Sequence, residues 1–199
     1  LKADMQEIAK LSADRIRQEL TVSETIVSEL GCSYQLSAAV FTPAQKQEYI
    51  NQRVEAYGMV RGKLIGSNGI CAADGTDYND REYFKRSMQG KDGEIIGVVF
   101  VVPDPEFLND ICAAISISEH SGCYLLGSTG ITIAHSDSAI AQEQKNNIEL
   151  SQTDSSLKGI AKIEQQMLKG ETGYGTYFRK GAYTLQAYAP IEGTNGWMV

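Results

Sequence analysis

An arginine and two aromatic side chains gather in one short stretch of this 199-residue chain, residues 74–90. A polar, glycine-containing loop there leads into a short helical pattern that opens with Asp80-Arg81 and carries Tyr83 and Phe84. A guanidinium fork beside aromatic walls is suited to holding a small carboxylate or zwitterion. The stretch contains no obvious nucleophile and no metal-ligand spacing. Its chemistry therefore favours holding a ligand over transforming one.

Composition excludes several classes of protein. A net charge of -7 without any Lys/Arg cluster argues against a nucleic-acid partner. No apolar run is long enough to span a membrane. The chain begins on a leucine and stops in a strand-like run, so we expect a parent protein that continues at both ends.

The cysteines give no sign of a metal site. They lack CxxC or histidine-linked spacing, so we expect neither a metal nor a cofactor. In an oxidising space they could form up to two disulfides, but their apolar surroundings favour small buried hydrophobic residues. The four are Cys32, Cys71, Cys112 and Cys123.

Two helical patterns open the chain. Apolar residues recur at mostly three- and four-residue steps from residue 2 to about residue 37, including Tyr34, and no proline interrupts them. This predicts a rod of roughly 50 Å. Thr42-Pro43 then supplies a helix N-cap and a first-turn proline, with Gln45 at the capping-box position. The helix that follows should end at Gly58.

Short strand-like runs and helical patterns alternate after Gly58. The first series has strands at 59–60, 63–65, 70–73 and 95–102 and a helix at 107–115; the second has strands at 123–126 and 131–135, a helix at 157–168, and strands at 174–178, at 183–190 and from 197. This order predicts an α+β fold, in which a long N-terminal helix carries two modules of antiparallel strands. The expected division is 1–57, 58–118 and 119–199.

Three groups of motifs resemble the double Cache (dCache) family, the periplasmic or extracellular sensor regions of bacterial chemoreceptors, histidine kinases and diguanylate cyclases. The helix at 80–90 is similar to the family's Arg-x-aromatic-aromatic helix. Residues 93–99 followed by Phe107-Leu108 resemble its last membrane-distal strand and return helix. Residues 130–137, with 188–191 and Gly196-Trp197, resemble its membrane-proximal module. Their order and spacing extend the resemblance over essentially the whole chain.

The resemblance implies an extracytoplasmic sensor with two PAS-like modules and no catalytic activity. The first helix would be a stalk that rises from a transmembrane segment before Leu1, and its apolar stripe could serve as the seam of a homodimer. A second transmembrane helix would follow Val199. Family members place two or more further strands where this chain has only Lys91-Asp92. We therefore expect residues to be missing between these two, the alternative being a truly shortened module.

The resemblance also implies a ligand site in the membrane-distal module. Arg81 would bind a carboxylate, and the acidic strand residue that takes an ammonium in amino-acid binders is replaced by Val102. A small carboxylate or an uncharged molecule therefore fits better than an amino acid, because a buried unpaired ammonium is costly. The expected site residues are Arg81, Tyr83, Phe84, Tyr78, Thr76 and Val102.

Plainer interpretations exist for the same residues. Arg81 could be a helix-start arginine that pairs with Asp77 or Asp80 on the surface, and Tyr83 and Phe84 could be core residues. The whole domain could be a dimerisation and spacing module that binds nothing.

A small hydrolase that uses His135 or His120 is a third possibility. No Gly-x-Ser-x-Gly elbow supports it, and His135 with Asp137 lacks a third metal ligand. A hydrogen-bonded strand histidine is the simpler interpretation of His135.

Overall fold

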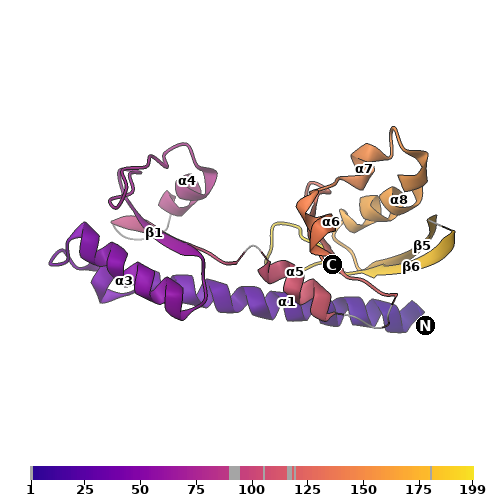
Figure 1. Ribbon diagram of the computed structural model, residues 1–199, viewed down its shortest axis with the longest axis horizontal. Coiled ribbons are helices and arrows are strands. Elements are labelled where there is room, and N and C mark those ends of the chain that lie inside the picture. Colours follow the sequence, from indigo (N-terminus) through magenta and orange to yellow (C-terminus); the bar gives the residue numbers. More distant parts are fainter. Residues whose placement is uncertain (1, 90–94, 105, 116–117, 119, 180) are drawn as a thin grey trace. The chain divides into compact units, whose positions relative to one another are not determined.

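The computed structural model describes residues 2–89, 95–104, 106–115, 118, 120–179 and 181–199, which form two compact units (Figure 1). One unit consists of residues 21–104 and is called the 21–104 unit. The other consists of residues 1–20 together with 105–199 and is called the C-terminal unit. Helix α1 (Lys2–Gly31) contributes residues to both. The predicted α+β fold, with a long first helix and small antiparallel sheets, is confirmed. The expected break between Lys91 and Asp92 lies outside the described residues.

Helix α1 is shorter than the sequence pattern predicted. It ends at Gly31, and Ser33 takes an extended conformation before the single turn of α2 (Tyr34–Ser37). At 1.5 Å per residue the helix is about 45 Å long. Extending it to residue 37 was wrong because glycine is a poor helix former and the chain turns directly after it. Tyr34, expected on the packed stripe, is 68% exposed.

The 21–104 unit is built on α3 (Pro43–Ala56) and on β1 (Arg61–Gly66), which pairs antiparallel with β2 (Gly97–Val102). The predicted capping box is present, because Thr42 and Gln45 each bond the other's backbone N–H through their side chains. Helix α4 (Glu82–Met88) is the predicted short helix. One face of the strand pair packs on α1 and α3 through Leu64, Val99 and Val101 against Ile26, Leu30, Leu36, Ile50 and Val54.

The C-terminal unit contains two antiparallel pairs: β3 (Tyr124–Leu126) with β4 (Thr132–His135), and β5 (Gly173–Arg179) with β6 (Ala182–Tyr188). Bridges from Met198 to Leu126 and to Pro190 link them. The predicted helices appear as α5 (Phe107–Ala114) and α8 (Lys158–Met167). The short helices α6 (Ser138–Gln142), α7 (Asn147–Leu150) and a 3-10 turn (Ser155–Leu157) were not predicted.

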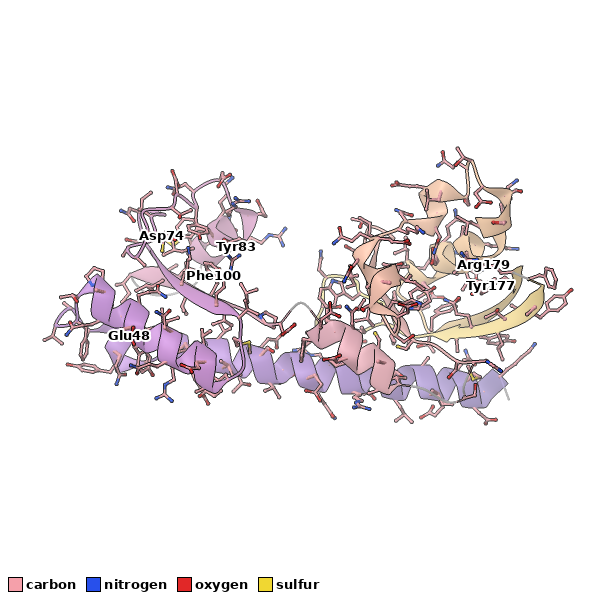
Figure 2. The ribbon with its side chains drawn as sticks, in the orientation of Figure 1. Glu48, Asp74, Tyr83, Phe100, Tyr177 and Arg179 are labelled. Atoms are coloured by element: carbon pink, nitrogen blue, oxygen red, sulfur yellow. The ribbon has the colours of Figure 1, made fainter. Side chains whose placement is uncertain are left out.

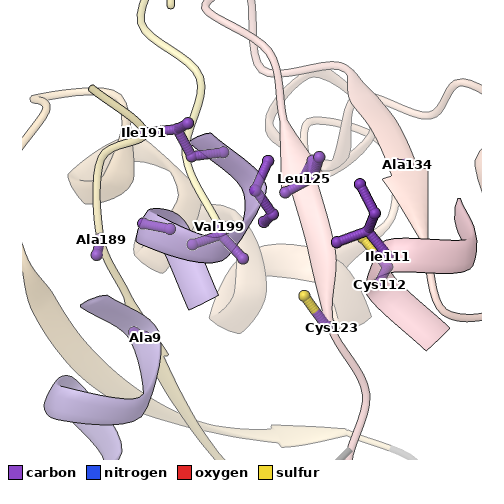
Figure 3. Close-up of a cluster of buried hydrophobic side chains, with 11 residues drawn as sticks. Ala9, Ile111, Cys112, Cys123, Leu125, Ala134, Ala189, Ile191 and Val199 are labelled. Atoms are coloured by element: carbon purple, nitrogen blue, oxygen red, sulfur yellow. The ribbon is translucent and has the colours of Figure 1, made fainter. Parts of the chain in front are cut away.

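Two hydrophobic clusters hold this unit together. One joins α1 and α5 to the strands through Ile16, Ile111 and Leu125; Figure 3 shows Ile111 and Leu125 with their neighbours. The other joins α8 to the strands through Met167 and Leu126. Contacts of α5 with β3 and β4 place this helix in the C-terminal unit, whereas the sequence division ended a module at residue 118. The assignment of these segments to functional modules stays a prediction.

The cysteines are all free thiols. Cys71, Cys112 and Cys123 are buried, as their apolar surroundings suggested, while Cys32 is exposed just after the end of α1. No helix among the described residues has both the length and the apolar character to cross a bilayer.

Candidate functional site

The strands of the 21–104 unit present a second face, opposite the one that packs on α1 and α3. Side chains alternate along a strand, so residues next to Leu64 and Val101 point away from that core. Lys63 pairs directly with Phe100 across the two strands, and Arg61 pairs with Val102. We call this surface the β1–β2 face.

Three aromatic rings meet on the β1–β2 face. The ring centroids of Tyr78 and Tyr83 each lie 5.8 Å from that of Phe100, and 6.5 Å from one another. Figure 2 shows Tyr83, Phe100 and Asp74 in the same region of the unit. Burial, followed by the neighbouring Tyr78, raises the pKa of Tyr83, which nevertheless stays 45% exposed. The cluster therefore offers partly open aromatic surface beside a tyrosine that is neutral at physiological pH.

An ion pair closes one side of the cluster. The Lys63 ammonium donates a hydrogen bond to the Asp74 carboxylate, which also accepts the Thr76 backbone N–H at 3.0 Å. These donors, Lys63 first, hold the pKa of Asp74 well below its usual range, and the same bond raises the pKa of Lys63. The two charges compensate one another. The charges of Arg81 and Arg61 both lower the pKa of Tyr83, so these are the cations felt at the rings.

The predicted site residues fall into three groups: residues of the β1–β2 face, one core residue and two residues at the edge of the site. Tyr83 and Tyr78 belong to the ring cluster, and Val102 lies on the same face of β2. Phe84 is a core residue, only 4% exposed.

Arg81 and Thr76 occupy the edge of the site. Arg81 is the N-cap of α4; its guanidinium is exposed, and its Nε lies 3.6 Å from Asp80 Oδ1. This is the surface pair that the plainer interpretation expected. Thr76 is exposed and orients Asp74 through its backbone N–H. No observation assigns ligand contacts to these residues, which stay predictions.

Sequence reasoning missed four residues of the site: Arg61, Lys63, Asp74 and Phe100. For three of them, the two-residue alternation of strand side chains could have indicated that they share a face. Phe100 precedes Val102 by two positions, and Arg61 and Lys63 alternate with Gly62 and Leu64. No local pattern indicates that Asp74 pairs with Lys63, because that contact joins residues 11 positions apart.

His135 is held by its neighbours. The ring atom Nδ1 of His135 accepts a hydrogen bond from the Asp137 backbone N–H at 2.8 Å, and the backbone N–H of His135 donates to Asn109 Oδ1 at 3.1 Å. Burial lowers the pKa of His135. Asp137 caps α6 by accepting the Ala139 N–H. No group of three potential metal-ligating side chains occurs within the described parts of the chain. These contacts correspond to a hydrogen-bonded strand histidine.

Comparison with known proteins identifies a matching family and solved structures with a similar fold. A family model described as Cache domain matches residues 1–199. The ligand-binding domain of the Pseudomonas fluorescens chemoreceptor CtaA, in complex with L-serine, has a TM-score of 0.71 at 16% identity, covering 96% of this chain and 92% of that one. The ligand-binding domain of the Pseudomonas aeruginosa PAO1 amino acid chemoreceptor PctB, in complex with L-Arg, has a TM-score of 0.71 at 14% identity, covering 100% and 85%.

A third similar structure is an extracellular ligand-binding receptor from Desulfohalobium retbaense, with a TM-score of 0.67 at 15% identity, covering 98% of this chain and 39% of that one. At these identities the likeness establishes a shared fold. No curated protein sequence matches this chain.

Proposed function

Because this chain belongs to the Cache-domain family over its whole length, we propose that it is the extracytoplasmic sensing domain of a membrane receptor. It binds a small, carboxylate-bearing molecule on the β1–β2 face. The observation that carries this proposal is the half-open cluster of three aromatic rings on the β1–β2 face, with Arg61 on β1 of the same face and Arg81 at the start of α4, two residues before Tyr83.

The charges on the face favour a carboxylate. With Lys63 and Asp74 neutralising one another, the charged side chains that act on Tyr83 are two cations, Arg81 and Arg61, and one anion, Asp80. The pair between Arg81 and Asp80 is long and both side chains are more than half exposed, so breaking it costs little. A guanidinium freed in this way can donate two parallel hydrogen bonds to a ligand carboxylate.

Binding can be transmitted through the strands themselves. Phe100 contacts the ring cluster, while its neighbours Val99 and Val101 pack against residues of α1 and α3. Ligand contact and helix contact thus lie on opposite faces of the same two strands. A small displacement of β2 on binding changes the packing on α1, which gives a sensor its output. Pairing of two copies through α1 stays a prediction.

The experiment is a thermal-shift screen of the chain against small organic acids and amino acids, with calorimetry on each hit. Charge-assisted hydrogen bonds contribute about 1.5–3 kcal/mol. Arg81→Ala should therefore weaken a carboxylate ligand by roughly 10- to 150-fold. Arg86→Ala is the matched control, because Arg86 lies on the same helix and pairs with Glu82 at 3.1 Å in solvent.

Two results would count against the proposal. Binding that survives in both Arg81→Ala and Arg61→Ala would move the ligand away from this face. A screen without any ligand would favour the spacer interpretation, in which the domain only dimerises and sets a distance. Turnover that disappears in His135→Ala would instead indicate the hydrolase.

A further inference from the structure

The C-terminal unit contains a cavity of about 570 Å³, separate from the β1–β2 face. This volume is in the range of small-molecule sites. Part of its wall is the side of the β5–β6 hairpin that faces α8, where Tyr177 pairs across the strands with Thr184 and Arg179 lies two residues beyond Tyr177. Figure 2 shows Tyr177 and Arg179 together on this hairpin. Tyr124, Asn147 and Gln186 add polar side chains to the lining, which also includes the ion pair of Lys145 with Glu143.

A buried carboxylate lies directly behind this wall. Glu164 on α8 is completely buried, and all of its hydrogen bonds go to one oxygen. Asn147 Nδ2 donates to Glu164 Oε1 at 2.8 Å, and the Tyr124 hydroxyl lies 3.3 Å from the same oxygen. Gln186 Nε2 in turn donates to the Tyr124 hydroxyl at 2.6 Å. Three cavity-lining side chains are therefore connected to this single carboxylate.

The network leaves two acceptor oxygens unpaired. Glu164 Oε2 and Gln186 Oε1 are both buried, and neither has a hydrogen-bond partner among the described residues. A buried polar group without a partner costs about 1–3 kcal/mol, and more when it is charged. Nor does any ion pair reach Glu164 within the described part of the chain. What the network lacks is a donor, and a positively charged one would also compensate the carboxylate.

Arg179 supplies the opposite charge to the same cavity. It is half-buried on β5, and no ion pair to it occurs among the described side chains. Its charge is close enough to lower the pKa of Glu164, against the larger effect of burial, which raises it. The cavity thus combines a guanidinium in its wall with a buried carboxylate behind it, and neither belongs to an ion pair among the described residues. The charge of Arg179 also contributes, after the hydrogen bonds from Ser156, to lowering the pKa of Asp154.

We propose that this cavity is a second ligand site, which takes a small molecule carrying both a carboxylate and a protonated amine. The carboxylate binds Arg179, and the amine donates to Glu164 Oε2 and Gln186 Oε1. Both acceptor oxygens are covered by other side chains. Binding therefore includes a rotamer change of Gln186, a movement common at binding sites.

The test measures binding of the common L-amino acids to the whole 199-residue chain by calorimetry. The corresponding 2-hydroxy acids, which lack the amine, and the corresponding amines, which lack the carboxylate, are the matched probes. An amino acid should bind, and either deletion should weaken it at least about tenfold, or about 1.4 kcal/mol. Arg179→Gln and Glu164→Gln should each weaken it by a similar factor.

Control variants separate this site from the β1–β2 face. Lys169→Gln and Glu149→Gln remove exposed charges from the same unit and should leave the affinity within twofold. Arg81→Ala should also leave it unchanged, whatever its effect on a ligand of the β1–β2 face. Thermal unfolding of each variant verifies that it folds.

Three outcomes would overturn the inference: no amino acid binds, binding is unchanged in both Arg179→Gln and Glu164→Gln, or binding is lost only in Arg81→Ala. The last would place the amino acid on the β1–β2 face and leave the proposed function intact.

Discussion

Replacing the buried carboxylate with an amide should change how stability depends on pH. Burial raises the pKa of Glu164, and it outweighs the hydrogen bonds from Asn147 and Tyr124 and the charge of Arg179, which all lower it. The folded state therefore binds the proton of this group more tightly than the unfolded chain does. Ionisation of Glu164 penalises folding only above its unfolded pKa.

The magnitude follows from the linkage between protons and folding. Each unit by which the folded pKa exceeds the unfolded one removes about 1.4 kcal/mol of stability at neutral pH. For a chain of this length that corresponds to roughly 3–6 °C in Tm. In Glu164→Gln this loss is absent. The amide is neutral and keeps an acceptor at Oε1, so any change in its hydrogen bonding alters stability equally at every pH and leaves the pH dependence unaffected.

The assay is Tm against pH from 4 to 8 for the wild type, Glu164→Gln and the exposed control Glu149→Gln, all without ligand. The Tm of Glu164→Gln should increase relative to that of the wild type once the pH exceeds the pKa of Glu164 in the unfolded chain, near 4.3. The increase should level off above the pKa of Glu164 in the folded state. The tyrosines near Glu164, Tyr124 and Tyr177, have raised pKa values and stay neutral over this interval.

Two results would refute this reasoning. A difference that stays constant from pH 4 to 8 would mean that the pKa of Glu164 is not raised. A difference that moves in favour of the wild type with increasing pH would mean that the carboxylate is stabilised by a partner, and that the cavity needs no cationic ligand.

Three further predictions concern the fold. Leu125→Ala removes a completely buried side chain of β3 and should destabilise by about 2–5 kcal/mol. Leu11 is 59% exposed, so Leu11→Ala should change stability by less than about 0.5 kcal/mol in denaturant titrations. Thr42→Ala removes one half of the capping box and should cost about 1 kcal/mol of stability. The hydroxyl of Ser33 is buried without a partner among the described residues, so Ser33→Ala should be neutral or stabilising. An equal loss of stability in both variants would contradict the capping argument. Ellman's reagent should react rapidly with one thiol, that of Cys32, and with the others only after unfolding; a native reaction that persists in Cys32→Ser would contradict the burial.

Local sequence signals determined the elements of this protein well. The Thr42 cap, the proline after it and Gly58 bound α3 because capping and backbone preference act within a few residues. Strand alternation likewise located β1, β2, β5 and β6 to within a few residues. The signal failed where two local tendencies competed, as at Gly31, and where helices of four or five residues had too few positions to show a period.

The tertiary structure alone decided the sites. Lys63 meets Asp74, and Tyr83 meets Phe100, only because two strands and a loop adopt one register. The sequence predicted the helix that carries Glu164 but gave this residue no role. That it is buried, bonded through one oxygen and next to a cavity depends on strands about 20 to 40 residues away along the chain. Helix and strand periods fix which face a residue occupies, but the packing of distant elements fixes what that face meets.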